Sequence, residues 1–430
     1  TYDKDTHKFT AEATSDYLAL INKDKSTSYA MPIVDVYATA NTSNAKFSNS
    51  YEIWENDANV ESNTVNNTTP DIKPVKDVEE GETTGNTGTS INKDKIVKGQ
   101  DITYPLSVND LVANRATDLN SFKYVDTLPK EVDYKSAKVS SADGKTDLTK
   151  YFTITFDEKT RLFTATANAD YLKLANADKT KAFALPVVSV YAVANKDNAT
   201  ITNQYDIWEN NSKTESNTVE NTTPSVNPVK LDLDSNGKDI NGQDVKPNQI
   251  MNYALTWDLT GLDKAVISDN VINKGLSFSD DYDQTKLDIP AKTKTDFTVV
   301  DTTTKNSVMS ELTLTWDEQN GKWTLKANDP KTFLKNHAGH KLTIEFHPVT
   351  KPDATGELVN TAVQNNFGQD YKTDTVKNNI TPNPKPSEPT KNTPNTSYGE
   401  KPMGLILTSV FAGIVAITGA TIYWFKKRRN

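Results

Sequence analysis

A long internal repeat constrains this chain more than any other feature of its sequence. The phrase IWEN at 53–56 returns at 207–210, and ESNTV at 61–65 returns at 215–219, in both cases 154 residues later. A repeat of about 150 residues is a whole domain, large enough to bury a hydrophobic core without metals. We therefore expect the 430 residues to form a tandem array of related domains.

Proline marks the boundaries of the repeated units. NTTP occurs at 67–70 and again at 221–224, and NITP occurs at 379–382. Proline ends strands and stiffens joints between domains. The predicted divisions are 1–70 (the C-terminal half of a truncated repeat), 71–224 (a complete unit), 225–382 (a second, divergent unit), 383–402 (a Pro-rich spacer), 403–425 (a transmembrane segment) and 426–430 (a basic cytoplasmic tail).

The pattern inside each unit indicates β-strands. Runs such as FTATA at 163–167 and LTLTW at 312–316 alternate or are β-branched, and Asn, Asp and Gly turns separate them. DEQNGK at 317–322 predicts a hairpin turn, and short helices are expected near 170–174 and 331–334. The predicted fold class is all-β, with tandem β-sandwich (immunoglobulin-like or adhesin) domains in series.

Composition excludes some functions. The net charge of −9 argues against nucleic-acid binding, because no basic patch is available to attract phosphates. The chain has no cysteine, so disulfides contribute nothing to its stability. We find no constellation for turnover catalysis and predict that the protein is not an enzyme.

The C-terminal sequence predicts an anchored surface protein. Residues 403–425 carry no charged side chain and are long enough to cross a bilayer as a helix, and KKRR at 426–429 marks the cytoplasmic side. Upstream, Thr393, Pro394, Asn395, Thr396 and Ser397 resemble the sorting pentapeptide Leu-Pro-x-Thr-Gly, matching it at Pro394 and Thr396. We expect an extracellular protein that sortase joins to peptidoglycan, or one held permanently by its membrane helix.

A lysine, an acid and an asparagine in register suggest an internal cross-link. Lys76 and Lys230 keep the repeat offset, Asp126 lies between the ends of its unit, and Asn217 and Asn221 alternate with Val219 on a final strand. A buried lysine loses its proton and becomes a nucleophile, and a buried Asp keeps its proton. The amine could then attack an Asn side chain and release ammonia. Taken singly, each residue is more ordinary as a solvated lysine or a turn asparagine.

Several blocks resemble a known family. SFSDDYDQT at 277–285, TWDL at 256–259 and the Asn-x-x-Pro unit ends followed by Pro-x-Lys are similar to the C-terminal domains of streptococcal antigen I/II-type adhesins. Those domains are sandwiches with an intramolecular Lys–Asn isopeptide bond assisted by an Asp. The resemblance implies that Lys76, Asp126 and Asn217 form such a bond in the second unit.

In the third unit the sequence leaves alternatives for the assisting acid and for the acceptor. Lys230 matches, but the assisting acid is Asp269 by local alignment, which we prefer, or Asp280 by strict offset. The acceptor is Asp374, at the position of Asn217; otherwise it is Asn378, and then Asn221 serves in the second unit.

Metal binding has weak support in the sequence. Asp232, Asp234 and Asn236 match the opening of a calcium loop that lacks its final Glu, so a polar turn is the better interpretation and calcium a secondary one. His337, His340 and His347 offer no sign of convergence, and we expect no metal there. No other cofactor is expected.

The sequence thus predicts a cell-wall-anchored adhesin stalk, cross-linked within its own domains, that attaches to a host or partner-cell glycoprotein or matrix protein. The alternatives are a structural shaft without an adhesive face, and a stalk that displays an N-terminal binding or enzymatic domain.

Overall fold

The computed structural model describes residues 1–210 and 212–382. They divide into two compact units, Thr1–Ile72 and a second unit that begins at Lys73. The predicted spacer, sorting pentapeptide, transmembrane segment and basic tail lie outside the described residues. Within the described part, no helix is both long enough and apolar enough to cross a membrane.

The first unit contains short paired strands and one helix. Its elements are β1 (Tyr2–Asp3), β2 (Lys8–Phe9), α1 (Ser15–Ile21), β3 (Lys46–Asn49), β4 (Glu52–Glu55), β5 (Ala58–Glu61) and β6 (Val65–Thr68). The pairs are β1–β2, β3–β6 and β4–β5, and no residue of Thr1–Ile72 is buried. Ile53 is half exposed, whereas Ile207, its counterpart in the next repeat, is fully buried. The first unit therefore carries core-type side chains without a facing sheet to cover them.

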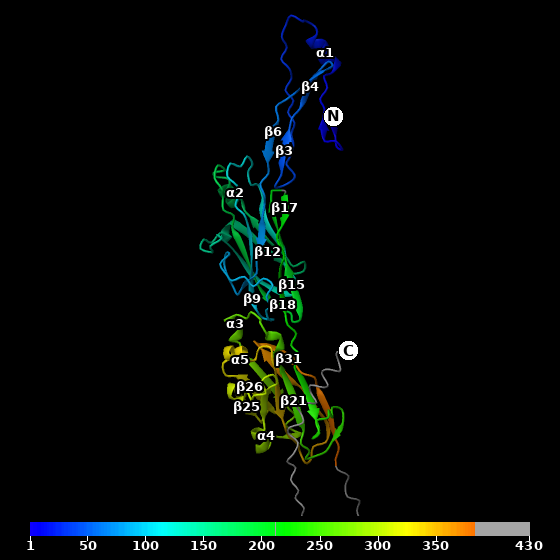
Figure 1. The fold of residues 1–430 in the computed structure, drawn as a ribbon, viewed down its shortest axis with the longest axis vertical. Helices are drawn as coiled ribbons and strands as arrows, with labels where there is room; N and C mark the ends of the chain where they lie inside the picture. Colours follow the sequence, from blue (N-terminus) through cyan, green and yellow to red (C-terminus); the bar gives the residue numbers. More distant parts are fainter. Residues whose placement is uncertain (211, 383–430) are drawn as a thin grey trace, which may run out of the picture. The chain divides into compact units, whose positions relative to one another are not determined.

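The second unit begins with a sandwich built from residues 73–224 (Figure 1). One sheet has the order β11-β14-β9-β7, with β8 also on β9; the other has the order β12-β13-β10-β16-β17, and β15 pairs with β18 alongside them. The elements are β7 (Pro74–Lys76), β8 (Glu79–Glu80), β9 (Asp101–Val108), β10 (Phe122–Thr127), β11 (Val132–Ser140), η1 (Thr149–Tyr151), β12 (Phe152–Asp157), β13 (Leu162–Ala167), α2 (Ala169–Ala175), β14 (Val187–Ala194), β15 (Ala199–Asn203), β16 (Tyr205–Glu209), β17 (Ser212–Glu215) and β18 (Val219–Thr223).

A second sandwich, from residues 225–382, repeats this topology. Its sheets have the orders β19-β21-β27-β24 and β25-β26-β22-β30-β31, and β29 pairs with β32 as β15 does with β18. The elements are β19 (Val229–Leu233), β20 (Asp244–Val245), β21 (Asn252–Asp258), η2 (Thr260–Leu262), α3 (Asp269–Ile272), β22 (Leu276–Asp281), β23 (Leu287–Asp288), α4 (Ala291–Thr295), β24 (Thr298–Asp301), η3 (Met309–Glu311), β25 (Leu312–Asp317), β26 (Lys322–Ala327), α5 (Pro330–His337), β27 (Lys341–Phe346), β28 (Val349–Thr350), β29 (Gly356–Asn360), β30 (Ala362–Asn366), β31 (Gln369–Lys372) and β32 (Val376–Ile380).

The structure confirms a mostly β fold, and the alternation of side chains explains it. Along β22 the buried residues are Leu276, Phe278 and Asp280, while Ser277 and Ser279 are only partly buried. Apolar side chains at every second position fill the space between facing sheets. Phe278 stacks on Trp323 with ring centroids 6.3 Å apart, and both rings are completely enclosed. An aspartate on the same inward-facing row of β22 is therefore in an apolar core.

Candidate functional site

A lysine is enclosed in the core of the first sandwich. Lys76 lies on β7, and its side chain has no exposed surface. It reaches across to the opposite sheet, where Nζ donates a hydrogen bond to Oδ2 of Asp126 on β10. The ring centroid of Tyr104 lies 4.6 Å from the same Nζ. The lysine thus ends among aromatic rings with one carboxyl group as its polar partner.

An asparagine shares that carboxyl oxygen. Ile201 and Asn203 are the inward-facing residues at the end of β15, and Asn203 is 4% exposed. Its Nδ2 donates to Oδ2 of Asp126 over 3.4 Å. Oδ1 of Asp126 has no hydrogen-bond partner among the described residues. An amine, a carboxyl group and a carboxamide therefore meet in one dry site.

Burial changes the protonation of this pair. Desolvation lowers the pKa of Lys76, although the charge of Asp126 and their hydrogen bond oppose the shift. Desolvation also raises the pKa of Asp126 against the opposing influence of Lys76. Both shifts favour the neutral forms, an amine and a carboxylic acid. A neutral amine has the lone pair that a nucleophile needs.

The second sandwich contains the same arrangement. Nζ of Lys230 on β19 donates to Oδ2 of Asp280 on β22 over 2.5 Å, and both side chains are completely buried. Nδ2 of Asn360, at the end of β29, donates to that oxygen over 3.3 Å. The Tyr253 ring lies 4.5 Å from the lysine nitrogen, as Tyr104 does in the first sandwich. Desolvation again lowers the pKa of the lysine and raises that of the aspartate.

The structure gives Asn217 a different place from the one we expected. Its side chain is exposed and pairs with the main chain of Lys76: Oδ1 accepts from the Lys76 N–H and Nδ2 donates to the Lys76 carbonyl, both over 2.9 Å. The alternative acceptor Asn221 is buried but donates to the carbonyls of Ile91 and Asp94. These two asparagines hold the backbone in place and do not contact the lysine amine.

The third unit also departs from the preferred assignment. Asp269 is exposed on α3 and pairs with Lys331 at 2.9 Å, so it is not near Lys230. Asp374 is exposed. Asn378 is buried and donates to the carbonyl of Ile240 over 2.9 Å. Of the residues considered from the sequence, Asp280 is the one in contact with Lys230.

Sequence reasoning overlooked Asn203 and Asn360, although a signal was present. ATITN at 199–203 alternates, so Ile201 and Asn203 share a face, and a polar residue in the inward row of a strand is unusual. The repeat offset pairs Asn203 with Asn49, at the end of β3. For Asn360 the offset from Asn203 is 157, because the third unit has three additional residues after Asp280. Strict spacing therefore misses it.

The calcium candidates do not form one site. Oδ1 of Asp234 accepts hydrogen bonds from the N–H groups of Asn236 and Lys238, which makes a tight turn. Asp232 instead faces the interior and is fully buried. Asp234 and Asn236 therefore belong to a polar turn, which was the preferred interpretation of the sequence.

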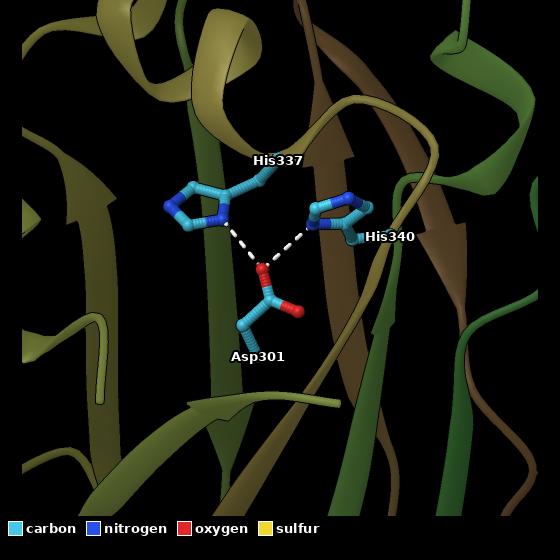
Figure 2. A group of neighbouring side chains, drawn as sticks. All are labelled: Asp301, His337 and His340. Carbon is cyan, nitrogen blue, oxygen red and sulfur yellow. Dashed lines mark hydrogen bonds and ion pairs between the residues drawn. The ribbon is translucent and has the colours of Figure 1, made fainter. Parts of the chain in front are cut away.

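Two histidines converge where none were expected to. Figure 2 shows the rings of His337 and His340 directed at one carboxyl oxygen of Asp301. The Nδ1–Oδ2 distances are 2.9 Å for His337 and 2.7 Å for His340. His347 lies elsewhere, with Nδ1 3.1 Å from Oδ1 of Asn252. The partner that sequence reasoning overlooked is Asp301, at the end of β24.

The family comparisons agree with the fold and the repeated site. Residues 73–224 match the cell surface antigen C-terminus family, and residues 228–380 match the cell surface antigen I/II C2 terminal domain family. The matched ranges together cover most of the chain and contain both buried lysine sites. The chain belongs to the antigen I/II family of surface adhesins.

A curated relative shares part of the sequence. An aggregation substance of Enterococcus faecalis is 38% identical over 167 residues, which is 38% of this chain and 13% of that protein. The chain thus matches only a small share of the length of this relative.

Solved structures support the fold. The C-terminal domain of the Streptococcus pyogenes antigen I/II-family protein AspA has a TM-score of 0.53 and 16% identity, covering 72% of this chain and 99% of that one. The C-terminal domain of the Streptococcus agalactiae antigen I/II polypeptide BspA has a TM-score of 0.52 and 18% identity, covering 71% of this chain and all of that one. At these identities the likeness concerns the fold alone.

Proposed function

We propose that this chain is the stalk of a bacterial surface adhesin whose two sandwich domains cross-link themselves. The bonds join Lys76 to Asn203 and Lys230 to Asn360, with Asp126 and Asp280 as the assisting acids. The observation that carries the proposal is the convergence of a buried amine and a buried carboxamide on one carboxyl oxygen, in both domains.

The chemistry follows from the neutral state of the buried groups. For the reaction, the carboxamide turns so that its oxygen faces the carboxylic acid in place of Nδ2. The lysine Nζ then attacks Cγ of the asparagine, and the acid donates a hydrogen bond that stabilises the oxygen as it becomes negative. The bond from Cγ to Nδ2 then breaks. One proton passes from Nζ through the carboxyl group to the departing nitrogen, so ammonia leaves and the acid is regenerated. Each domain performs this reaction once, on itself, and the protein is not a turnover enzyme.

The second part of the proposal concerns attachment to the cell. The pentapeptide at 393–397 would be read by sortase, with the carbonyl of Thr396 transferred to peptidoglycan, and the apolar segment and basic tail would hold the chain in the membrane until then. The adhesin family supports binding to a glycoprotein or matrix protein of a host or partner cell. A shaft without an adhesive face is the second candidate.

Intact mass measurement tests the cross-links directly. We expect the denatured wild-type chain to be lighter than its sequence mass by two ammonia molecules. Asn203→Ala and Asn360→Ala should each remove one of these deficits, because each deletes the carboxamide that the lysine attacks.

Matched controls separate the acceptors from their neighbours. Asn217→Ala and Asn378→Ala should keep both deficits, since those side chains bond to main-chain groups. A full-length mass without any deficit would refute the cross-links. Loss of a deficit in Asn217→Ala but not in Asn203→Ala would return the acceptor to the residue that the sequence suggested.

Binding experiments test adhesion separately. The chain, coupled to beads, should adhere to immobilised host-cell glycoproteins more than beads carrying an unrelated β-sandwich protein do. Equal adhesion of the two kinds of bead would favour the structural shaft.

A further inference from the structure

The cluster of Asp301, His337 and His340 has a hydrogen-bonding pattern that calls for a cation. His337 lies between two carboxyl groups: its Nδ1 is 2.9 Å from Oδ2 of Asp301, and its Nε2 is 3.1 Å from Oε1 of Glu311. Carboxylate oxygens accept hydrogen bonds, and a neutral imidazole has a single N–H to donate. A proton on Nε2 satisfies Glu311 and leaves the lone pair of Nδ1 facing a carboxylate oxygen. A positive charge between those two atoms removes the repulsion.

The second ring directs the same atom at the same place. Nδ1 of His340 lies 2.7 Å from Oδ2 of Asp301. The ligand atoms of the three residues all lie within 4.8 Å of one another. In Figure 2 the two rings lie to the left and to the right of this oxygen, and both point at it. Two imidazole nitrogens and a carboxylate oxygen form a donor set that suits zinc and similar divalent metals.

The carboxyl group of Asp301 is held in a fixed orientation. Oδ1 of Asp301 accepts hydrogen bonds from the N–H groups of Thr303 and Thr304, over 2.7 and 3.2 Å. These contacts orient the group so that Oδ2 faces both histidines.

The local fold pre-organises the two rings. Asp329 accepts from the N–H groups of Lys331 and Thr332 and so starts α5, whose last residue is His337. Gly339 then adopts a φ of +90°, which glycine tolerates, and the N–H of His340 returns to the carbonyl of His337 over 3.0 Å. The turn brings His340 back beside His337 just before β27 begins.

We propose that Oδ2 of Asp301, Nδ1 of His337 and Nδ1 of His340 bind one divalent transition-metal ion, with Zn²⁺ as the best fit. Glu311 accepts from the Nε2–H of His337 and orients that ring, as carboxylates behind metal-bound histidines commonly do. The His337 and Asp301 side chains are buried, whereas the His340 side chain is 24% exposed. Water therefore fills the fourth position on the side of His340.

The ion needs only a small adjustment of the rings. Zinc bonds of about 2.0–2.1 Å in tetrahedral geometry hold the ligand atoms about 3.3 Å apart. The Nδ1 atoms of His340 and His337 lie 2.7 and 2.9 Å from Oδ2, so each ring withdraws by about half an ångström as the metal enters. The exposed edge of His340 leaves room for that movement.

The test is a metal titration of the whole 430-residue chain. The protein is stripped with EDTA, titrated with ZnCl₂ by calorimetry, and its bound metal is measured after desalting. We expect one zinc ion per chain. Co²⁺ in place of Zn²⁺ should give the intense visible absorption of a tetrahedral site.

Variants assign the ligands. His340→Ala should abolish stoichiometric binding, and Glu311→Gln should weaken it about 10- to 100-fold. His347→Ala is the matched control, since that imidazole contacts Asn252 instead, and it should bind as the wild type does. His340 is the decisive position, because its side chain is partly exposed and its truncation should not prevent folding. Circular dichroism verifies the fold of the variant.

Two results would overturn the proposal. One is a wild-type chain that takes up no zinc after EDTA treatment. The other is zinc binding of equal stoichiometry and affinity in wild type and His340→Ala, which would place the ion elsewhere.

Discussion

A fully enclosed lysine such as Lys76 destabilises a protein unless its charge is paired or removed. Here Asp126 supplies the partner, and desolvation shifts both pKa values toward neutral forms. Conversion of the amine to an amide would remove the problem permanently. The same side chains therefore serve folding first and bond formation afterwards.

Deletion of the acid should separate these two roles. Asp126→Ala leaves the buried amine without its partner, so we expect no ammonia loss in that domain. The unpaired amine should lower the unfolding free energy by about 3–5 kcal/mol beyond the loss that the missing cross-link causes. Denaturant unfolding of the chain measures the stability, and mass spectrometry measures the bond.

A double variant provides the comparison. Lys76→Met together with Asp126→Leu replaces the pair by apolar side chains of similar size. The domain should therefore regain the part of the stability that the unpaired amine cost, about 3–5 kcal/mol, while it still lacks the contribution of the cross-link. If the double variant is as unstable as Asp126→Ala, then the buried pair contributes more than charge compensation.

Asp232 predicts a pH dependence of the second sandwich. It is fully buried, and burial raises its pKa to about 7. The carboxyl group therefore stays protonated in the folded domain while it ionises near pH 4 in the unfolded chain. Its contribution to stability is complete below pH 4 and is lost as the pH rises to 7.

Thermal unfolding at several pH values checks this expectation. The wild-type domain should lose about 2–4 kcal/mol between pH 4 and pH 8 through this residue, and Asp232→Asn should flatten that part of the profile. Asp234→Asn is the control, because Asp234 is only partly buried and lies in the adjacent turn. Equal slopes in wild type and Asp232→Asn would contradict the assignment.

Elements were easier to predict than the site. The alternation along 312–316 and the Asn-Gly pair at 320–321 predict a hairpin, and β25 and β26 form it, with Asp317 opposite Lys322. Strand patterns repeat over five or more residues, so several side chains report the same structure. Asn203 and Asn360 are single residues at strand ends, and their role depends on contacts with strands about 80 and 130 residues away in the sequence. No local pattern encodes those contacts.

The acids illustrate the same limit. Local alignment favours Asp269, but a short helix places it on the surface, whereas strict repeat spacing finds Asp280 on β22. Spacing works between Lys230 and Asp280 because that segment has the same length in both domains. It fails after Asp280, where three residues are added.

The geometry of the β25–β26 hairpin predicts that replacement of Gly321 lowers the stability of the second sandwich. Gly321 has a φ of +69°, and a Cβ there would lie 2.3 Å from the carbonyl oxygen of Tyr282. Gly321→Ala should therefore lower the unfolding free energy of the second sandwich by about 1–3 kcal/mol through strain and steric overlap.

Gly356→Ala is the matched control for the hairpin. Its φ of +83° is equally unusual for alanine, but no atom lies within 4 Å of the added Cβ. A smaller loss for Gly356→Ala than for Gly321→Ala, measured by denaturant unfolding, isolates the overlap. Equal losses would assign the whole effect to backbone strain.

At the scale of the molecule, each proposed bond closes a long loop. Between Lys76 and Asn203, or Lys230 and Asn360, lie about 130 residues, and the chain-entropy treatment of cross-links gives about 5 kcal/mol of stabilisation for each. Asn203→Ala and Asn360→Ala should each lower the unfolding free energy of their own domain by roughly that amount. Separate thermal transitions of the two sandwiches, each shifted by one variant only, would establish the effect. A variant that lacks its bond but melts unchanged would refute it.

The position of Asn203 at the end of β15 determines how the stalk yields when it is pulled. The proposed covalent loop ends there, so β16, β17 and β18 would lie outside it and be held by hydrogen bonds and packing alone. A pulling force can detach these strands while everything between Lys76 and Asn203 stays locked. At about 3.4 Å per residue, the roughly 20 residues that follow Asn203 release about 70 Å of contour length. Each sandwich would then contain a short segment that unfolds under force and can refold afterwards, joined to a cross-linked segment that does not extend.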